Sequence, residues 1–381
     1  MKVAQVVLTH LPADLSLLSA LSNIDPQLVL VFGCMEHFTD PTLVQALAEH
    51  FPHSQRVGCT TAGGISEDGV VDHATVVTAL HFDSATFSVA AAQLEGMASS
   101  FDAGADLAKQ LLSPELKAVL VLGQGGNING SALIEGMVSE LGESMPVTGG
   151  LAADDGAFLK TYTLSNEGVS TSNIVAVGFQ GDNLLFSHGS FGGWQPFGPT
   201  RKVTRCVGNI LYELDGAPAL DVYKRYLGEY AKDLPGSGLL FPFEMLSDMR
   251  ESLGQIRTIL GVNELDGSLI LAGVINPDGY LRLMHAQTND LVDGAEIAAN
   301  ASLEGIVAGR GQALGLLVSC VGRKLVMGGR VDEEVEAVQD ILGAHTVLSG
   351  FYSNGEICPG YQLKACSLHN QTMTITYLAE K

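Results

Sequence analysis

Cysteine is scarce in this chain, and its spacing excludes one class of protein. The 381 residues include only six cysteines. No two of them form a CxxC pair, and six over this length are too few for the disulfide framework of a small secreted domain. We therefore expect a protein of a reducing compartment, the cytoplasm.

Basic residues are also few. The chain has 20 Lys and Arg against 42 Asp and Glu, which gives a formal net charge of −22. A field of this sign repels the phosphates of nucleic acids and the anionic head groups of lipids. We therefore expect neither a nucleic acid nor a membrane surface as a partner.

Long apolar runs are missing as well. No segment approaches the run of about 18 apolar residues that a membrane-spanning helix needs. The opening segment MKVAQVVLTHLPADLSLL has one Lys, and its apolar run is interrupted by Thr9, His10 and Asp14. This pattern predicts a first strand rather than a secretory signal peptide. With 46% hydrophobic residues, the chain can still bury a large core.

The common catalytic motifs are absent too. The sequence contains no GxxxxGK(S/T), no HExxH and no GxSxG, and GQGGNING (123–130) lacks the GxGxxG spacing that holds a pyrophosphate. Cys59 could act as a nucleophile if a neighbour lowered its pKa, but a small buried cysteine is the alternative interpretation. We expect no enzyme, and an enzyme dependent on Cys59 or His369 is the least favoured hypothesis.

A strand–helix–strand unit, by contrast, occurs three times. Its copies open with the apolar runs LVLVFG (28–33), AVLVLGQGG (118–126) and LGLLVSC (314–320). Each copy spans a similar distance from this first strand to a glycine turn, measured as Val31 to Gly58, Leu120 to Gly149 and Val318 to Gly350. We infer an internal duplication.

The glycines that end these strands have two interpretations. Glycine permits tight turns with positive φ, and it also lets a backbone approach a ligand closely. The three turns are GCTTAGGIS (58–66), GGLAADDG (149–156) and GFYSNGEI (350–357). Because ligands of α/β sheets bind outside strand ends, we expect the ligand cleft beside these turns, with HNQT (369–372) close by.

The alternation of strands and helices predicts an α/β fold with layered sheets and helices. The length favours two domains, which we place at 1–195, with two repeats, and 196–381. Within the second domain, three runs are joined by the turn signals ELDG and NPDG and predict an antiparallel meander. These runs are IRTILGVN (256–263), SLILAGVI (268–275) and YLRLMHA (280–286).

Taken in order, these motifs resemble the FIST sensory proteins. GCTTAGGIS and GGLAADDG resemble the FIST N domain, whereas GAPALDVYKRYLG, the meander, GFYSNGEICP and HNQT resemble the FIST C domain. The resemblance covers essentially the whole chain and implies an intracellular sensor of small molecules. We expect no appended output domain, and on that expectation the chain is similar to stand-alone nitric-oxide-sensing proteins of the NosP type. The resemblance then implies bound haem and a histidine kinase as partner.

Candidate ligand-binding residues lie in the glycine turns and in HNQT. They are Gly58, Cys59, Thr60, Thr61, Gly63, Asp154, Asn354, Glu356, His369 and Asn370. Glu356 leads, because a carboxylate in an apolar glycine-rich turn must be paired or must face a ligand. Asp154 could instead belong to an ordinary turn, and His369 could be a turn histidine with satisfied hydrogen bonds.

Haem would need a His or a Cys thiolate in an apolar pocket. The candidates for this role are His188, His285, Cys358 and His369, and the axial ligand and the oligomeric state stay open. The favoured hypothesis is haem-based sensing of nitric oxide with regulation of a kinase. The alternative is an amino acid or another small polar metabolite, bound by Asn354, Glu356 and the amides of the glycine turns.

Overall fold

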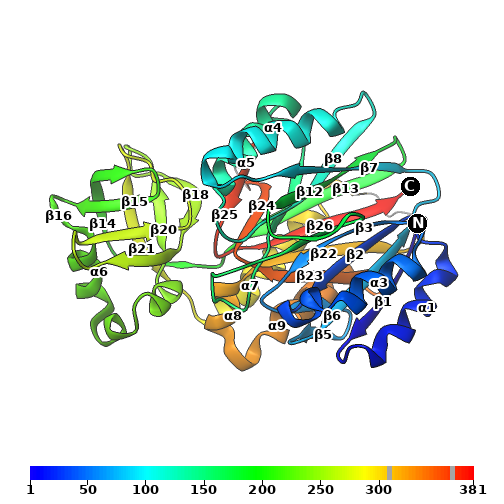
Figure 1. Cartoon of the computed structure of the whole chain (residues 1–381). Coiled ribbons are helices and arrows are strands. Elements are labelled where there is room, and N and C mark those ends of the chain that lie inside the picture. Colours follow the sequence, from blue (N-terminus) through cyan, green and yellow to red (C-terminus); the bar gives the residue numbers. More distant parts are fainter. Residues whose placement is uncertain (307–310, 361–364) are drawn as a thin grey trace.

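The computed structural model describes residues 1–306, 311–360 and 365–381. Three six-stranded sheets with flanking helices form a main body, and residues 195–285 form a small domain beside it (Figure 1). The predicted α/β class is confirmed. No helix in the described ranges is long and apolar enough to cross a membrane.

Each copy of the repeat supplies four strands to one sheet. The first copy supplies β1 (Lys2–Leu8), β2 (Leu28–Gly33), β3 (Gln55–Thr60) and β6 (Thr75–His81). The second supplies β7 (Thr86–Gln93), β8 (Leu116–Gly123), β9 (Val147–Leu151) and β12 (Asn173–Gln180). The third supplies β13 (Leu184–Phe191), β22 (Ala313–Cys320), β23 (Thr346–Ser353) and β26 (Met373–Glu380).

These strands have the same order in all three sheets. The orders are β1-β6-β2-β3, β7-β12-β8-β9 and β13-β26-β22-β23. In each sheet the last two strands are parallel, and the other pairs are antiparallel. The shared order supports the inferred duplication in all three units.

Each unit also gives a hairpin to a neighbouring sheet. These hairpins are β4 (Gly64–Ser66) with β5 (Gly69–Val71), β10 (Thr163–Ser165) with β11 (Gly168–Ser170), and β24 (Gly355–Pro359) with β25 (Cys366–His369). The first pairs with β23, the second with β3 and the third with β9. Every sheet therefore receives a hairpin from another unit, and the three sheets close into a ring.

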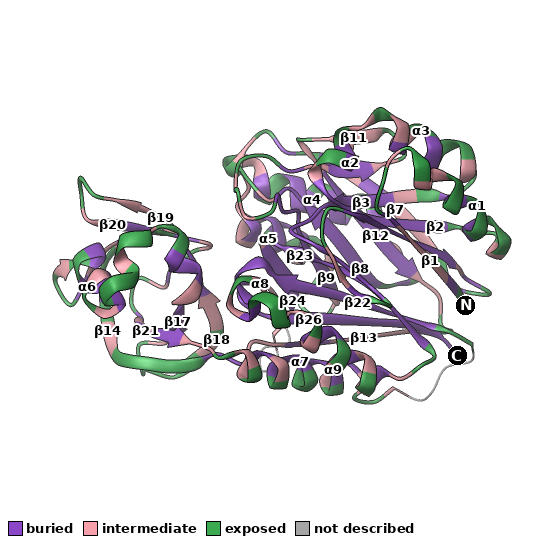
Figure 2. Cartoon of the chain, turned by 90° about the horizontal axis from the view of Figure 1, so that it is seen from below, coloured by how far each residue is buried: buried purple, intermediate pink, exposed green. Residues whose placement is uncertain are grey.

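The helices cover the outer faces of the ring. The first unit has α1 (Leu18–Leu21), α2 (Met35–Thr39) and α3 (Pro41–His50), the second has α4 (Ser100–Leu111) and α5 (Gly130–Leu141), and the third has α7 (Thr288–Ser302), α8 (Val321–Met327) and α9 (Asp332–Leu342). A side chain caps the start of α3, since the Asp40 carboxylate accepts a hydrogen bond from the Thr42 N–H. Buried residues follow the sheets, and exposed residues follow the outer helices (Figure 2).

Both faces of the central strands are buried, which explains their continuous apolar runs. In β2, Leu28, Leu30 and Phe32 join a core cluster shared by all three sheets. Val29 and Val31 point to the opposite face and join the cluster beneath α1 and α3. The two clusters alternate along the strand because successive side chains of a strand point to opposite faces.

The small domain is antiparallel throughout. Its elements are β14 (Gln195–Val207), β15 (Ile210–Leu214), β16 (Ala217–Pro218), α6 (Ala219–Leu227), β17 (Phe243–Leu246), β18 (Ser252–Arg257), β19 (Ile259–Asn263), β20 (Ser268–Leu271) and β21 (Tyr280–His285). Antiparallel pairing over the predicted meander is confirmed, and β19 and β20 form a hairpin. β20 and β21 are not neighbours, however, because β14 and β15 lie between them.

The predicted division at residue 195 coincides with the first residue of β14. After the small domain the chain returns to the main body, where β26 lies between β13 and β22. Strands from 1–195 and from 196–381 therefore share one sheet, while the domain boundary itself stays a prediction.

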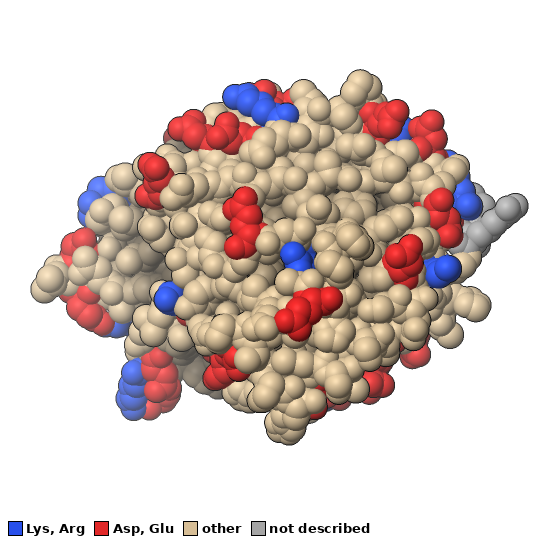
Figure 3. All heavy atoms as spheres, turned by 45° about the vertical axis from the view of Figure 1, so that its right-hand side comes forward, with Lys and Arg blue, Asp and Glu red and all other residues tan. Residues whose placement is uncertain are grey.

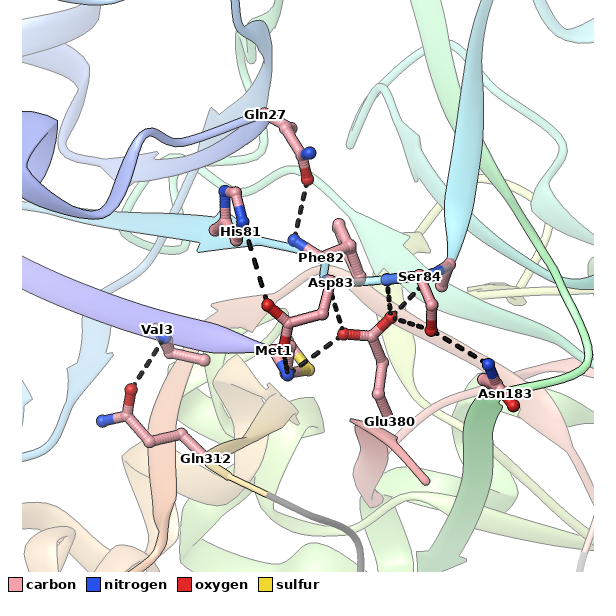
Figure 4. Close-up of polar contacts among 11 residues, drawn as sticks. Met1, Val3, Gln27, His81, Phe82, Asp83, Ser84, Asn183, Gln312 and Glu380 are labelled. Carbon is pink, nitrogen blue, oxygen red and sulfur yellow. Dashed lines mark hydrogen bonds and ion pairs between the residues drawn. The ribbon is translucent and has the colours of Figure 1, made fainter.

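An ion cluster holds the two ends of the chain together (Figure 4). The N-terminal ammonium of Met1 lies 2.9 Å from Asp83 Oδ2 and 3.0 Å from Glu380 Oε2. Burial raises the pKa of Glu380, but hydrogen bonds from the N–H groups of Ala85 and Asp83 and from the ammonium outweigh it and lower the pKa to about 2. The cluster thus fastens β26 to the start of β1 and to the turn before β7.

Candidate functional site

The three predicted glycine turns meet within the main body and bond to one another. The Ala153 N–H donates to the Thr60 carbonyl at 2.9 Å, and the Ala62 N–H donates to the Tyr352 carbonyl at 2.9 Å. The Asn354 N–H completes the set by donating to Leu151 at 3.2 Å. These amides are therefore engaged in holding the units together, whereas our prediction assigned the amides of the glycine turns to a ligand.

Three equivalent glycines have a common structural reason. A Cβ on each would lie 1.9 Å from the carbonyl oxygen opposite it on the parallel strand, which belongs to Val31 for Gly58, to Val121 for Gly149 and to Leu317 for Gly350. Such a distance is far below van der Waals contact. Close packing of two strands accounts for these glycines without a ligand.

The candidates of the first turn lie inside the protein. Cys59, Thr60 and Thr61 are at most 1% exposed, and burial raises the pKa of the Cys59 thiol well above its usual range. Thr60 Oγ1 accepts a hydrogen bond from the Tyr162 N–H at 3.1 Å. Gly63 lies under the Lys324 side chain, whose Nζ would be 2.5 Å from a Cβ there. The side chains and the glycine of this turn are therefore used in internal packing.

Asp154 organises its own loop. Its carboxylate accepts hydrogen bonds from the N–H groups of Phe158, Leu159 and Lys160 at 2.7–2.9 Å. Asp155, the next residue, has φ of 55°, which marks the turn. The turn interpretation of Asp154 is the one that these contacts favour.

Glu356 is fully buried and joins the third hairpin to the HNQT segment. Its Oε2 accepts hydrogen bonds from the N–H and the hydroxyl of Thr372 at 3.0 and 2.9 Å, and its Oε1 accepts one from Ser353 Oγ at 2.8 Å. Burial raises the pKa of Glu356 to about 7, although these donors favour the charged form. The carboxyl group has protein partners on both oxygens.

His369 lies opposite Glu356 on the paired strand. Its Nε2 is 3.0 Å from the Cys358 carbonyl and 3.1 Å from Ser367 Oγ. Burial, together with the charge of Arg257, lowers the pKa of His369 to about 4. The imidazole is therefore neutral near pH 7.

Three clefts surround β25, where the small domain meets the main body. The hinge cleft has a volume of about 240 Å³ and is lined by Trp194, Glu244, Ile256, His369 and Thr372 among others. The arginine cleft, of about 500 Å³, is lined by Arg257, Asn276, Ser131, Glu135 and Glu143 among others. The asparagine cleft, of about 150 Å³, is lined by Gly130, Asn209, Gly273, Asn354 and Asn370 among others.

The asparagine cleft brings two predicted ligand residues together. The Oδ1 atoms of Asn354 and Asn370 are buried and have no hydrogen-bond partner within the described part of the chain, and Asn370 is only 1% exposed. The first turn of α5 lies at the same cleft, where the Asn129 side chain caps the helix by accepting from the Ala132 N–H. Buried acceptors thus lie at one cleft with a helix N-terminus, where backbone N–H groups lack helical partners.

The small domain, together with Trp194 just before it, is bonded to the HNQT segment and to the strand before that segment. The Trp194 indole N–H donates to the Gln371 carbonyl at 2.8 Å, and Gln371 Nε2 donates to the Leu239 carbonyl at 2.9 Å. Arg257 Nη1 donates to the Leu368 carbonyl at 3.3 Å. Sequence reasoning missed these three residues. Only Gln371 carried a signal, since it lies within HNQT.

The four haem candidates fit the group poorly in this arrangement. His188 and His285 line none of the three clefts, and Cys358 has no exposure, with its thiol pKa raised by burial. His369 lines the hinge cleft, but its volume of about 240 Å³ is below the roughly 300–1,000 Å³ of pockets that bury a drug-sized ligand, and a haem is at least as large as such a ligand. Among described residues, no group of three or more His, Cys, Asp and Glu could hold a metal ion. Haem binding stays a prediction.

Comparison with known proteins identifies two family domains in the chain. The FIST N domain matches residues 27–217, and the FIST C domain matches residues 219–359. An uncharacterised protein of Methanocaldococcus jannaschii is 25% identical over 225 residues, 54% of this chain and 41% of that protein. One of Mycobacterium tuberculosis is 28% identical over 236 residues, 58% of this chain and 59% of that protein. The chain thus spans about two to three fifths of the length of these relatives.

Among solved structures, the chain is similar to a cyanuric acid hydrolase from A. caulinodans. That likeness covers 100% of this chain and 99% of the other, with 10% identity and a TM-score of 0.41. A second cyanuric acid hydrolase structure matches with a TM-score of 0.36 and 11% identity, over 100% of this chain and 99% of the other.

Proposed function

Because the chain belongs to the FIST family, whose domains are sensory modules that bind small ligands in signalling proteins, we propose that it senses a small polar metabolite, such as an amino acid. We place this ligand in the asparagine cleft. This is a binding function without catalysis.

The buried Oδ1 of Asn370 is the observation that carries the proposal. A buried polar atom without a partner destabilises a protein by about 1–3 kcal/mol, so such atoms need a reason. An N–H group of a ligand, for example an ammonium group, would supply the missing donor to Asn370 and Asn354.

The first turn of α5 supplies the complementary chemistry. Its backbone N–H groups and the positive end of the helix dipole favour a carboxylate. A ligand with both an ammonium and a carboxylate would therefore match the two kinds of polar group at this cleft. A cavity of about 150 Å³ holds a molecule of the size of benzene, which suits a small amino acid and excludes a nucleotide.

The position of the cleft also suits signalling. Asn209 and Gly273 belong to the small domain, whereas Gly130, Asn354 and Asn370 belong to the main body. A ligand that contacts both sides would shift the equilibrium between relative positions of the two parts, provided that it binds one position better. We propose that a partner histidine kinase reads this shift.

The negative charge of the protein indicates which surface charge a partner should have. On the face shown in Figure 3, acidic side chains are scattered over the surface and outnumber the basic ones. With a net charge of −22, the protein associates fastest with a basic docking surface.

A thermal-shift screen of the twenty amino acids tests the proposal. A ligand at 100 times its dissociation constant should stabilise the fold by about 2.7 kcal/mol. The Asn370→Ala variant should lose this response, whereas the Asn183→Ala control, with an exposed asparagine far from the cleft, should keep it. A screen without any stabiliser, or an unchanged response in Asn370→Ala, would contradict the proposal.

Haem-based sensing of nitric oxide is the second candidate. It is supported by the family resemblance and by His369, which lines the hinge cleft together with the apolar side chains of Trp194 and Met284. An absorption spectrum after haem reconstitution tests it. A Soret band that is absent from His369→Ala would support the candidate, and the absence of a Soret band in the wild type would refute it.

A further inference from the structure

Arg257 is a buried charge that has no counter-ion among the residues that the structure describes. The side chain is 3% exposed, at the end of β18 in the small domain. Its N–H groups donate to the carbonyls of Val274, Ile256 and Leu368 and to Gln255 Oε1, at 3.1–3.3 Å. These are four of the five N–H groups of a guanidinium. The fifth, on Nη2, has no partner in the ranges that the structure describes.

No carboxylate of the described residues forms an ion pair with Arg257, although the chain has 42 acidic residues. Burial lowers the pKa of Arg257 to about 10. The positive charge of Arg257 in turn helps to lower the pKa of its neighbour His369. Burying an ion without an opposite charge is expensive, so buried charges are normally paired. Here the described residues do not supply the anion.

The guanidinium borders the arginine cleft, the largest of the three clefts. Asn276 and Ser131 add polar groups to its wall. Two exposed acids, Glu135 and Glu143, line the cleft from the side of α5. The cleft therefore has a cationic group in the small domain and carboxylates on the main body.

We propose that the arginine cleft is a second ligand site, which takes a small molecule with a carboxylate at Arg257 and a cationic group toward Glu135 and Glu143. Arginine is the residue suited to a carboxylate, because its planar donors match the two oxygens. The two glutamates would repel a simple anion, and they attract a ligand whose far end is an ammonium group. This site is separate from the asparagine cleft, and it does not depend on what binds there.

Three small probes of similar shape test the site on the full chain. Butyrate carries the carboxylate, butyramide is its neutral counterpart, and 4-aminobutyrate adds the distal ammonium. Titration calorimetry and thermal shift should show binding of butyrate without binding of butyramide. 4-Aminobutyrate should bind more tightly than butyrate, and the Glu135→Gln/Glu143→Gln variant should lose that difference.

The variants assign the binding to Arg257. Arg257→Gln should weaken both carboxylate probes about tenfold or more, the scale of a hydrogen bond to a charged group. Arg205→Gln removes the same charge from an exposed position of the small domain and should leave binding unchanged. If Arg257→Gln does not fold, Arg257→Lys should keep weakened binding.

Three results would overturn the proposal. They are equal responses to butyrate and butyramide, full butyrate affinity in Arg257→Gln, and loss of butyrate binding in Asn370→Ala. The last result would move the carboxylate to the asparagine cleft. If Asn370→Ala binds butyrate normally, and none of the twenty amino acids of the thermal-shift screen stabilises the wild type, then this site is supported while the proposed function is refuted.

Discussion

Removing one partner of the ion pair between Arg323 and Glu334 should strongly destabilise the main body, because the other charge would stay buried without a partner. Both side chains have 0% exposure, and Glu334 Oε2 accepts from Arg323 Nη2 at 2.7 Å and from Nε at 3.1 Å. The other oxygen, Oε1, accepts from the hydroxyls of Ser319 and Tyr352 at 2.9 and 2.7 Å. Each carboxylate oxygen of Glu334 therefore accepts two hydrogen bonds.

Arg323 also holds both connections to the small domain. It donates to the carbonyl of Gly192, between β13 and β14, and to the carbonyl of Leu291, in α7 after β21. Without the carboxylate of Glu334, the Arg323 guanidinium would no longer be held in place to bond the two segments that connect the main body to the small domain. We therefore expect the change to reach the small domain as well as the core.

The perturbation is Glu334→Gln, which keeps the shape and removes the charge. Removing one partner of a buried pair leaves the other charge uncompensated, which destabilises proteins by about 3–5 kcal/mol. The matched control is Glu333→Gln, the adjacent residue on α9. Its pair with Arg330 is 40–52% exposed, so solvent screens the two charges and this variant should stay close to the wild type in stability.

Urea denaturation followed by circular dichroism measures the difference between the two variants. A double variant, Arg323→Met with Glu334→Leu, should recover part of the loss, because replacing both charges removes the need for pairing. The reasoning fails if Glu334→Gln falls within about 1 kcal/mol of Glu333→Gln. It also fails if the double variant is as unstable as the sum of its two single changes.

The remaining predictions concern glycine and pH. Overpacking a core typically costs about 1–3 kcal/mol, and Gly350→Ala should destabilise the fold by about 3 kcal/mol or more, because the new Cβ meets the Leu317 carbonyl. Gly126→Ala, where a Cβ meets nothing within 4 Å, should stay near wild type. Equal melting temperatures of the two variants would refute this prediction. The depressed pKa of Glu380, about 2 against 4.5 unfolded, means that its stabilisation is present above pH 4.5 and is lost as the pH falls toward 2, so that Glu380→Gln should flatten acid unfolding there. Glu356 has the opposite sign: its pKa, raised to about 7, gives a contribution that is complete below pH 4.5 and lost as the pH rises through 7, so that urea denaturation of Glu356→Gln at pH 5 and pH 8 should show less of this loss than the wild type.

Local patterns were enough to predict the elements and the repeat. Apolar runs bounded by glycine predicted the central strands, because side-chain periodicity acts within a few residues. Asp40 with Pro41 is a local signal of the same kind for the start of α3. The three matching units and the FIST motifs followed from the same linear order. For Asn354 and Asn370, the resemblance pointed to residues that the structure then places at one cleft.

Tertiary structure decided which glycine turns hold strands together and which residues line a cleft. In the sequence, glycines such as Gly58 and Gly350 are typical both of ligand-binding turns and of closely packed strands. Only the carbonyl opposite each of them in the structure shows that close packing requires a glycine there. The clefts depend on contacts between distant residues, such as Arg257 with Leu368, 111 positions apart, and Gln371 with Leu239, 132 positions apart. Nothing in the spacing of the residues encodes such pairs, because they arise only when the small domain packs on the third hairpin. The sequence by itself therefore determined the elements, their repetition and the family, whereas the place where a charge or an acceptor lacks a partner was decided by the packing of the whole chain.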